Sequence, residues 1–252
     1  MPTIFGLIGK ALSHSFSKAY FASKFQHLHL YDFSYELWEI EYLNNIRSFI
    51  QQKKYVQGFN VTIPFKEEII KYLDVVSDEV LHIGACNCVH IQKDVWIGYN
   101  TDWWGFIKMI ENKLESHHMG ALILGTGGAA KAIAYGLQKL QIAYLFVSRQ
   151  IKNTLAPCIT YTDLTHKHFE EYPIIINTTP LGMYPNIHVR PAIPMDFIDE
   201  KNFVIDINYN PPKTQLLVEA EKHQAKILNG LEMLYLQAEK SWYIWQKAHT
   251  NI

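Results

Sequence analysis

The sequence predicts an α/β protein of two domains, in which strands and helices alternate. The chain has 252 residues, which is enough for two small domains. Short apolar segments alternate with segments of helical periodicity along most of it. A glycine-rich turn near residue 125 opens a second series of such segments. We therefore expect a first domain at 1–101 and a second at 102–230, with the C-terminal helix 231–252 packing back on the first.

The composition is typical of a globular protein that binds neither nucleic acid nor membrane. Hydrophobic residues make up 48% of the chain, charged residues 19%, and the net charge is -1. No run of about 18 apolar residues predicts a membrane span, and the first residues lack the features of a signal peptide. The three cysteines are an odd number, which fits a reducing compartment, so we expect a cytoplasmic location. No CxxC or HExxH spacing occurs, so we expect no metal site.

Apolar runs and helical spacing predict the elements of the first domain in order. Strands are expected at 3–8, 31–36, 58–62, 83–89 and 95–98. Helices are expected at 18–25, at 39–52 and directly after Pro64, which suits a first helical turn. Ser17 is a candidate cap for the first of these helices.

The second domain repeats the alternation. Strands are expected at 121–124, 141–147, 173–177 and 203–207. Helices are expected at 103–114, 130–140, 213–223 and 231–249, and a loop rich in proline at 180–194.

The turn after the strand at 121–124 has the form G-x-G-x-x-A. Gly125 permits the tight turn, Gly127 lets a pyrophosphate approach the backbone, and Ala130 lets helix and strand pack closely. The free N–H groups at the start of the helix would then bind the phosphates. A βα turn with no ligand can carry the same pattern, so the motif alone leaves both interpretations open.

The end of the next strand favours NADP over NAD. A site for NAD has an acidic residue there, which binds the ribose 2′-hydroxyl. The chain instead reads Ser148-Arg149-Gln150 and has no Asp or Glu from Gln141 to Thr162. A guanidinium at 149 suits a 2′-phosphate, although an exposed loop arginine would look the same.

Three further positions could carry chemistry. Hydroxyls crowd the loop at 13–17, where they could bind a polyol or carboxylate, or cap a helix. Lys66 lies just after Pro64, where a helix dipole and partial burial would lower its pKa and prepare it for proton transfer. Asp102 begins the next helix, where an N-cap role is the simpler interpretation.

Taken together and in this order, seven motifs resemble the shikimate dehydrogenase family over nearly the whole chain. They are Ser-His-Ser-Phe-Ser at 13–17, Asn-Val-Thr-Ile-Pro-Phe-Lys at 60–66, Gly-Ala-Cys-Asn at 84–87, Asn-Thr-Asp at 100–102, Gly-Thr-Gly-Gly-Ala at 125–129, Asn-Thr-Thr-Pro at 177–180 and Asn-Gly-Leu-Glu-Met-Leu at 229–234. The resemblance implies a substrate domain, a Rossmann-type NADP-binding domain, and reversible reduction of 3-dehydroshikimate to shikimate by NADPH.

The resemblance also implies roles for individual residues. Lys66 and Asp102 would form the catalytic pair. The substrate would be bound by Ser15 and Ser17 at its carboxylate, by Thr62, Asn87 and Gln237 at its ring hydroxyls, and by Tyr209 near the carboxylate. The cofactor site would comprise Gly125, Thr126, Gly127, Gly128 and Ala129 at the phosphates, Ser148 and Arg149 at the ribose 2′-phosphate, Thr178, and Gly230 and Met233 near the nicotinamide. We expect a monomer or homodimer whose partner is the small-molecule substrate.

The chain departs from the family pattern at several positions. Lys10-Ala11 replaces Asn-Pro, Lys18 replaces Pro, and Cys88 follows Asn87 where Thr is common. A second basic residue expected near the 2′-phosphate is Asn153, with Lys152 beside it. These departures bear on the tightness of NADP binding more than on the reaction.

Three other functions remain open. One is a relative that also, or mainly, oxidises quinate with NAD, and the missing acid after the second cofactor strand argues against it. A ligand-binding regulator without turnover conflicts with the presence of both Lys66 and Asp102. A folate-type dehydrogenase matches the serine loop and Asn-Thr-Asp less well.

Overall fold

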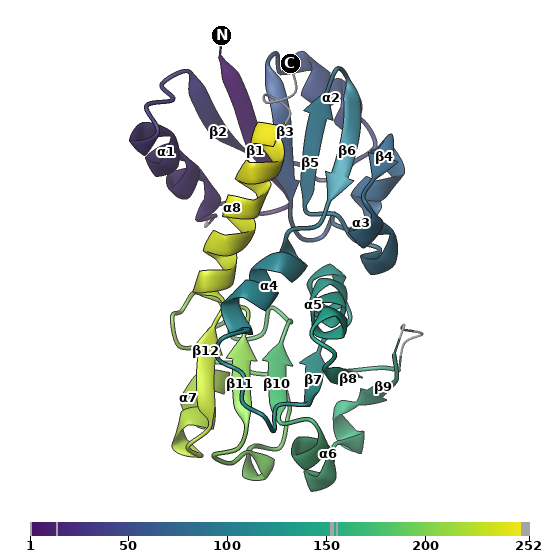
Figure 1. The fold of residues 1–252 in the computed structure, drawn as a ribbon, viewed down its shortest axis with the longest axis vertical. Helices are drawn as coiled ribbons and strands as arrows, with labels where there is room; N and C mark the ends of the chain where they lie inside the picture. Colours follow the sequence, from purple (N-terminus) through teal and green to yellow (C-terminus); the bar gives the residue numbers. More distant parts are fainter. Residues whose placement is uncertain (1, 14, 152–153, 155, 248–252) are drawn as a thin grey trace. The chain divides into compact units, whose positions relative to one another are not determined.

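The computed structural model describes residues 2–247 except 14, 152–153 and 155, and it divides the chain into two compact units (Figure 1). Unit 1 comprises Met1–Thr101 and Ala238–Ile252, and unit 2 comprises Asp102–Gln237. The division falls inside the last helix, α8 (Leu231–Lys247), whose first seven residues belong to unit 2. The sequence predicts that the whole of this helix packs on the first domain, whereas the division assigns its first two turns to unit 2.

Unit 1 is built on a mixed sheet of six strands. Their order is β2-β1-β3-β5-β6-β4, with β5 antiparallel to both of its neighbours. The strands are β1 (Thr3–Gly9), β2 (Phe33–Glu39), β3 (Val56–Val61), β4 (Val75–Val76), β5 (Cys88–Gln92) and β6 (Val95–Tyr99). Alternate side chains of β1 point to opposite faces, and both faces are covered by helices.

Each face of this sheet has its own core. On one face, Phe21 of α1 (Ser17–His27) and Trp242 and Trp245 of α8 pack against Phe5 of β1. On the other, α2 (Ile46–Gln52), the 3₁₀ helix η1 (Glu68–Tyr72) and α3 (Asp78–Ile83) pack against Phe59 of β3. The C-terminal helix therefore packs on the first domain, as predicted, through residues from 238 onward.

Unit 2 is built on a parallel sheet of six strands in the order β12-β11-β10-β7-β8-β9. Its elements are β7 (Gly120–Leu124), β8 (Ala143–Ser148), β9 (Cys158–Thr160), β10 (Ile174–Asn177), β11 (Phe203–Asp206), β12 (Lys226–Asn229), α4 (Asp102–Ile110), α5 (Gly128–Lys139), α6 (His166–Glu171), α7 (Gln215–Lys222) and the 3₁₀ helices η2 (Tyr161–Asp163) and η3 (Met195–Phe197). Helices α4 and α5 pack on one face, α6 and α7 on the other. Read from β9, this is the 3-2-1-4-5-6 order of the Rossmann fold, so the predicted fold class is confirmed.

Several local predictions were wrong. Ser17 is the first residue of α1 and makes no capping hydrogen bond. No α-helix follows Pro64; residues 63–67 form turns that lead into η1, so Lys66 does not lie in a first helical turn. The strand expected at 83–89 begins only at Cys88, because α3 extends to Ile83 and ends on Gly84 at a φ of 69°.

Candidate functional site

The substrate residues predicted in unit 1 lie at one edge of its sheet. The parallel strands β1 and β3 both end at this edge, and the antiparallel pairing of β3 with β5 and of β5 with β6 brings the start of β5 and the end of β6 to it. The residues that follow or precede these strand ends are Ser15 and Ser17 after β1, Thr62 and Lys66 after β3, Asn87 before β5, and Thr101 after β6. Segments far apart in the sequence are thus collected by the strand topology.

The serine loop is connected to the core of unit 1. The Ser17 backbone N–H donates to the Ser15 hydroxyl at 3.3 Å. The Ser17 hydroxyl hydrogen-bonds the buried phenol of Tyr35, and that phenol donates to Asn60 at 2.9 Å. Burial raises the pKa of Tyr35 well above its ordinary value, so the phenol stays protonated. These bonds position Ser17 through a neutral, buried group.

Asn87 and Thr101 belong to a buried hydrogen-bond network. The Asn87 side-chain oxygen accepts from the Thr101 backbone N–H at 2.7 Å, and its amide donates to the Thr101 hydroxyl at 3.0 Å. The Asn60 amide donates to the Asn87 carbonyl at 3.0 Å and to the Ser241 hydroxyl of α8 at 2.9 Å. The network therefore fixes the end of unit 1 that leads directly into Asp102. Sequence reasoning missed Asn60 and Ser241 as supporting residues, because nothing in a single sequence pairs positions 181 residues apart.

The two predicted catalytic residues fall in different units. Lys66 lies in a turn of unit 1 with a half-buried side chain, and its carbonyl accepts from the Cys86 backbone N–H at 2.7 Å. Asp102 is the first residue of α4 and of unit 2, and it is buried. Their joint action stays a prediction.

The glycine turn in unit 2 has the geometry that the motif predicts. Gly125 has a φ of 111°, which glycine adopts without strain, and a side chain there would meet the Thr178 hydroxyl at 2.7 Å. A Cβ on Gly127 would meet no atom within 4 Å, so the backbone is open to a ligand at this point. Gly127 caps α5 with no side-chain hydrogen bond, which leaves the first N–H groups of the helix available to an anion. Thr126 lies between these glycines, and Gly128 and Ala129 form the first turn of α5.

Thr178 is held beside the glycine turn by bonds to β7. Its backbone N–H and hydroxyl both donate to the Leu124 carbonyl, at 3.0 Å and 2.6 Å. The preceding Asn177 donates to the Asp206 carboxylate at 3.0 Å, and Thr214 donates to the same carboxylate at 2.6 Å. Burial raises the pKa of Asp206, while these donors oppose the shift. The carboxyl ends of β7, β10 and β11 are thus tied together at the point where the strand order reverses, which is where Rossmann folds bind ligands.

Ser148 and Arg149 occupy the end of β8. Ser148 is buried, and its hydroxyl donates to the Gln150 carbonyl. Arg149 is exposed and forms no ion pair with any residue that the structure describes. Its guanidinium is available to an anionic ligand. Lys152 and Asn153, the positions considered for a second basic residue, lie outside the described residues, as does His14 of the serine loop.

The remaining predicted residues lie around β11, β12 and the start of α8. The Gly230 N–H donates to the Asn208 carbonyl at 3.1 Å, and a side chain at Gly230 would collide with the Ile207 backbone. Tyr209 is the next residue after Asn208 and is half-buried. Met233 is only 6% exposed and packs in the core of unit 2. Gln237, the last residue of this unit, donates to the Leu234 carbonyl at 2.8 Å.

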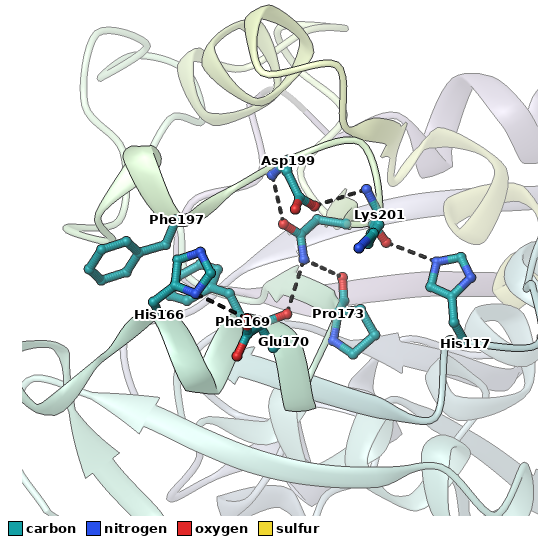
Figure 2. A pocket seen from close by; sticks show the side chains of 9 residues that line it. His117, His166, Phe169, Glu170, Pro173, Phe197, Asp199 and Lys201 are labelled. Atoms are coloured by element: carbon teal, nitrogen blue, oxygen red, sulfur yellow. Dashed lines mark hydrogen bonds and ion pairs between the residues drawn. The ribbon is translucent and has the colours of Figure 1, made fainter.

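A pocket of about 570 Å³ lies elsewhere in unit 2 (Figure 2). Its walls include Pro173 and Asn202, which precede β10 and β11, so it opens at the amino ends of these strands. Asn202 closes one side by donating to the carbonyls of Phe169 and Pro173 at 3.2 Å and 3.3 Å. The pocket is therefore at the opposite edge of the sheet from the glycine turn and contains none of the predicted site residues.

The described part of the chain contains neither a membrane-spanning helix nor a cluster of metal ligands. None of its helices is long and apolar enough to span a membrane. Within the same residues, no three His, Cys, Asp or Glu side chains gather in an arrangement that could hold a metal ion.

Comparison with known proteins establishes the family. A family model described as the shikimate dehydrogenase substrate binding domain matches residues 7–89. The chain is 38% identical to the shikimate dehydrogenase (NADP(+)) of Clostridium beijerinckii over 258 residues, covering 98% of this chain and 93% of the relative. The chain belongs to the shikimate dehydrogenase family.

Solved structures of shikimate dehydrogenases share the fold over nearly the full length of the chain. One from Peptoclostridium difficile is 36% identical, with a TM-score of 0.86, and covers 97% of this chain and 92% of its own. One from Thermus thermophilus, in complex with NADP(H) and shikimate, is 27% identical, with a TM-score of 0.86, and covers 97% and 94%. The family-model match contains the serine loop, Thr62, Lys66 and Asn87. It therefore includes every substrate residue that the sequence predicts in unit 1.

Proposed function

We propose that the protein is an NADP-dependent shikimate dehydrogenase, which reversibly reduces 3-dehydroshikimate to shikimate in the shikimate pathway of aromatic amino acid biosynthesis. The observation that carries the proposal is the collection of Ser17, Thr62, Lys66 and Asn87 at one edge of the unit 1 sheet. Membership of the shikimate dehydrogenase family supports the same substrate class.

The residues at this edge suit a small polyhydroxylated acid. Hydroxyls of Ser15 and Ser17 can donate to a carboxylate, and Thr62 and Asn87 can exchange hydrogen bonds with ring hydroxyls. The buried network behind Asn87 lowers the cost of binding, because its side chain is already oriented before the substrate arrives.

Unit 2 fits NADP. The open backbone at Gly127 and the uncapped start of α5 suit a pyrophosphate, and the exposed Arg149 at the end of β8 suits a 2′-phosphate. When bound, NADPH supplies the hydride for the reduction.

Lys66 and Asp102 act as the catalytic residues in this proposal. Reduction of a ketone places negative charge on its oxygen, and the Lys66 ammonium stabilises that charge and delivers the proton. Asp102 orients the ammonium and accepts a hydrogen bond from a substrate hydroxyl. We also propose a cytoplasmic enzyme that works as a monomer or homodimer.

An absorbance assay at the nicotinamide band tests the proposal. We expect rapid reduction of NADP with shikimate as the substrate. Reduction of NAD with shikimate, and reduction of NADP with quinate, should both be much slower. A preference for quinate with NAD would assign the chain to the alternative substrate, and tight binding of shikimate without turnover would identify a regulator.

A further inference from the structure

The carboxyl ends of β8 and β9 place two side chains next to each other, at the same end of the unit 2 sheet as the glycine turn. The strands are parallel and in register, with Phe146 opposite Cys158 and Ser148 opposite Thr160. Arg149 directly follows β8, and Tyr161, the first residue of η2, directly follows β9. Since paired residues of parallel strands advance together, these two residues leave the sheet side by side.

Tyr161 is held at this edge by packing. It is half-buried and packs against the apolar side chains on the face of the sheet that α6 and α7 cover. Its phenol is close enough to Arg149 for the guanidinium to act on it electrostatically. Among the described residues, the phenolic oxygen has no hydrogen-bond partner. The packed ring thus presents a hydroxyl that can donate a hydrogen bond to a ligand at this end of the sheet.

The charge state of Tyr161 makes it a donor. Burial raises the pKa of the phenol to about 12, and the positive charge of Arg149 only partly opposes the shift. The hydroxyl is therefore protonated at neutral pH and can donate a hydrogen bond to an anion held by the neighbouring guanidinium.

We infer that Tyr161 donates a hydrogen bond to the 2′-phosphate of NADP beside Arg149, and so contributes to the preference for NADP over NAD. The inference rests on the proposed function and adds a residue to its cofactor site. A hydrogen bond from a neutral donor to a charged phosphate is stronger than one to the ribose hydroxyl of NAD, so the phenol favours the phosphorylated cofactor. It supplies a second donor at the 2′-phosphate, where the expected basic residue is replaced by Asn153.

Calorimetric titration of the full chain with adenosine 2′,5′-bisphosphate and with 5′-AMP tests this role without requiring catalysis. The variant Tyr161→Phe removes the hydroxyl and keeps the packing of the ring. We expect it to weaken binding of the bisphosphate about tenfold and to leave binding of 5′-AMP unchanged. Tyr172→Phe is the matched control, because Tyr172 packs on the same face but lies before β10, at the opposite edge of the sheet. It should bind both nucleotides as the unmodified protein does.

The outcomes separate the inference from the function on which it rests. If the unmodified protein prefers the bisphosphate and Arg149→Ala loses that preference while Tyr161→Phe keeps it, Tyr161 has no role and the proposed function stands. If Tyr161→Phe weakens binding of both nucleotides equally, the ring contacts adenine and the proposed hydrogen bond to the 2′-phosphate is refuted. If the unmodified protein shows no preference for the bisphosphate, the NADP assignment fails, and the inference fails with it.

Discussion

Lys66 is the residue whose role can be tested most directly. Its carbonyl accepts from the Cys86 N–H, a backbone hydrogen bond that a substitution of the side chain leaves in place. We therefore expect Lys66→Ala to fold normally and to lower kcat by about 10²–10⁴-fold, the range typical of a lost general acid, with a smaller change in KM. Steady-state kinetics with shikimate and NADP measure both constants.

The control for this variant is Lys71→Ala. Lys71 is exposed in η1, five residues farther along the same segment, and carries the same charge. Its replacement should leave kcat within about twofold, as for a surface substitution away from the site. Turnover near normal in Lys66→Ala would remove the lysine from the mechanism.

The lowered pKa of the buried His118 predicts that the stability of the protein depends on pH. The residue is buried before β7, and its Nδ1 accepts from the Glu115 N–H at 2.9 Å. Burial lowers the pKa of the ring, and the neighbouring His117 adds to the shift. The unfolded chain therefore takes up a proton near the ordinary pKa of about 6.5, while the folded protein resists it, so stability should fall as the pH drops through this value.

The variant His118→Asn tests this explanation, because its side-chain oxygen can replace Nδ1 as acceptor but cannot be protonated. Melting temperatures at pH 7.5 and 5.5 should differ less in the variant than in the unmodified protein. An equal fall in both proteins would mean that other groups cause the acid sensitivity.

At the scale of elements, the C-terminal helix shows how one segment completes a domain. Trp245 is fully buried, stacks on Phe5 with ring centroids 4.5 Å apart, and donates from its indole N–H to the Val89 carbonyl at 3.0 Å. Trp245→Ala should lower the free energy of unfolding by about 3–5 kcal/mol, measured by urea denaturation followed by circular dichroism. Tyr243 of the same helix is 49% exposed, and Tyr243→Ala should lower the free energy of unfolding by less than about 1 kcal/mol.

Elements with a strong apolar pattern were predicted from the sequence, and elements with a weak pattern were not. The strand, glycine turn and helix at 120–139 were recognised because apolar spacing and glycine positions agree there. The strands β9 and β12 were missed because neither carries the fully buried apolar run that revealed the equally short β10 and β11. The turn at Lys66 was mistaken for a helix because Pro64 suits both structures.

The candidate site was predictable only where its residues lie within a local sequence motif. Motifs containing Ser17, Lys66 and Arg149 lie within single segments, so the sequence shows them. Support from Asn60 and Ser241 depends on contacts between distant segments. Tyr161 was missed because its proximity to Arg149 follows from the register of β8 and β9, which no local pattern encodes.

At the scale of the whole molecule, the residues proposed for the two ligands are largely supported inside separate units. Ser17 is connected to Tyr35 and Asn60 within unit 1, and Arg149 extends from β8 within unit 2. A substitution at one of these residues should therefore weaken its own ligand and spare the other. Ser17→Ala should reduce the increase in melting temperature that shikimate produces and keep the increase with NADP, whereas Arg149→Ala should do the reverse. Thermal unfolding of both variants with each ligand alone measures these four shifts. Loss of both shifts in either variant would show that the two binding sites are not built independently.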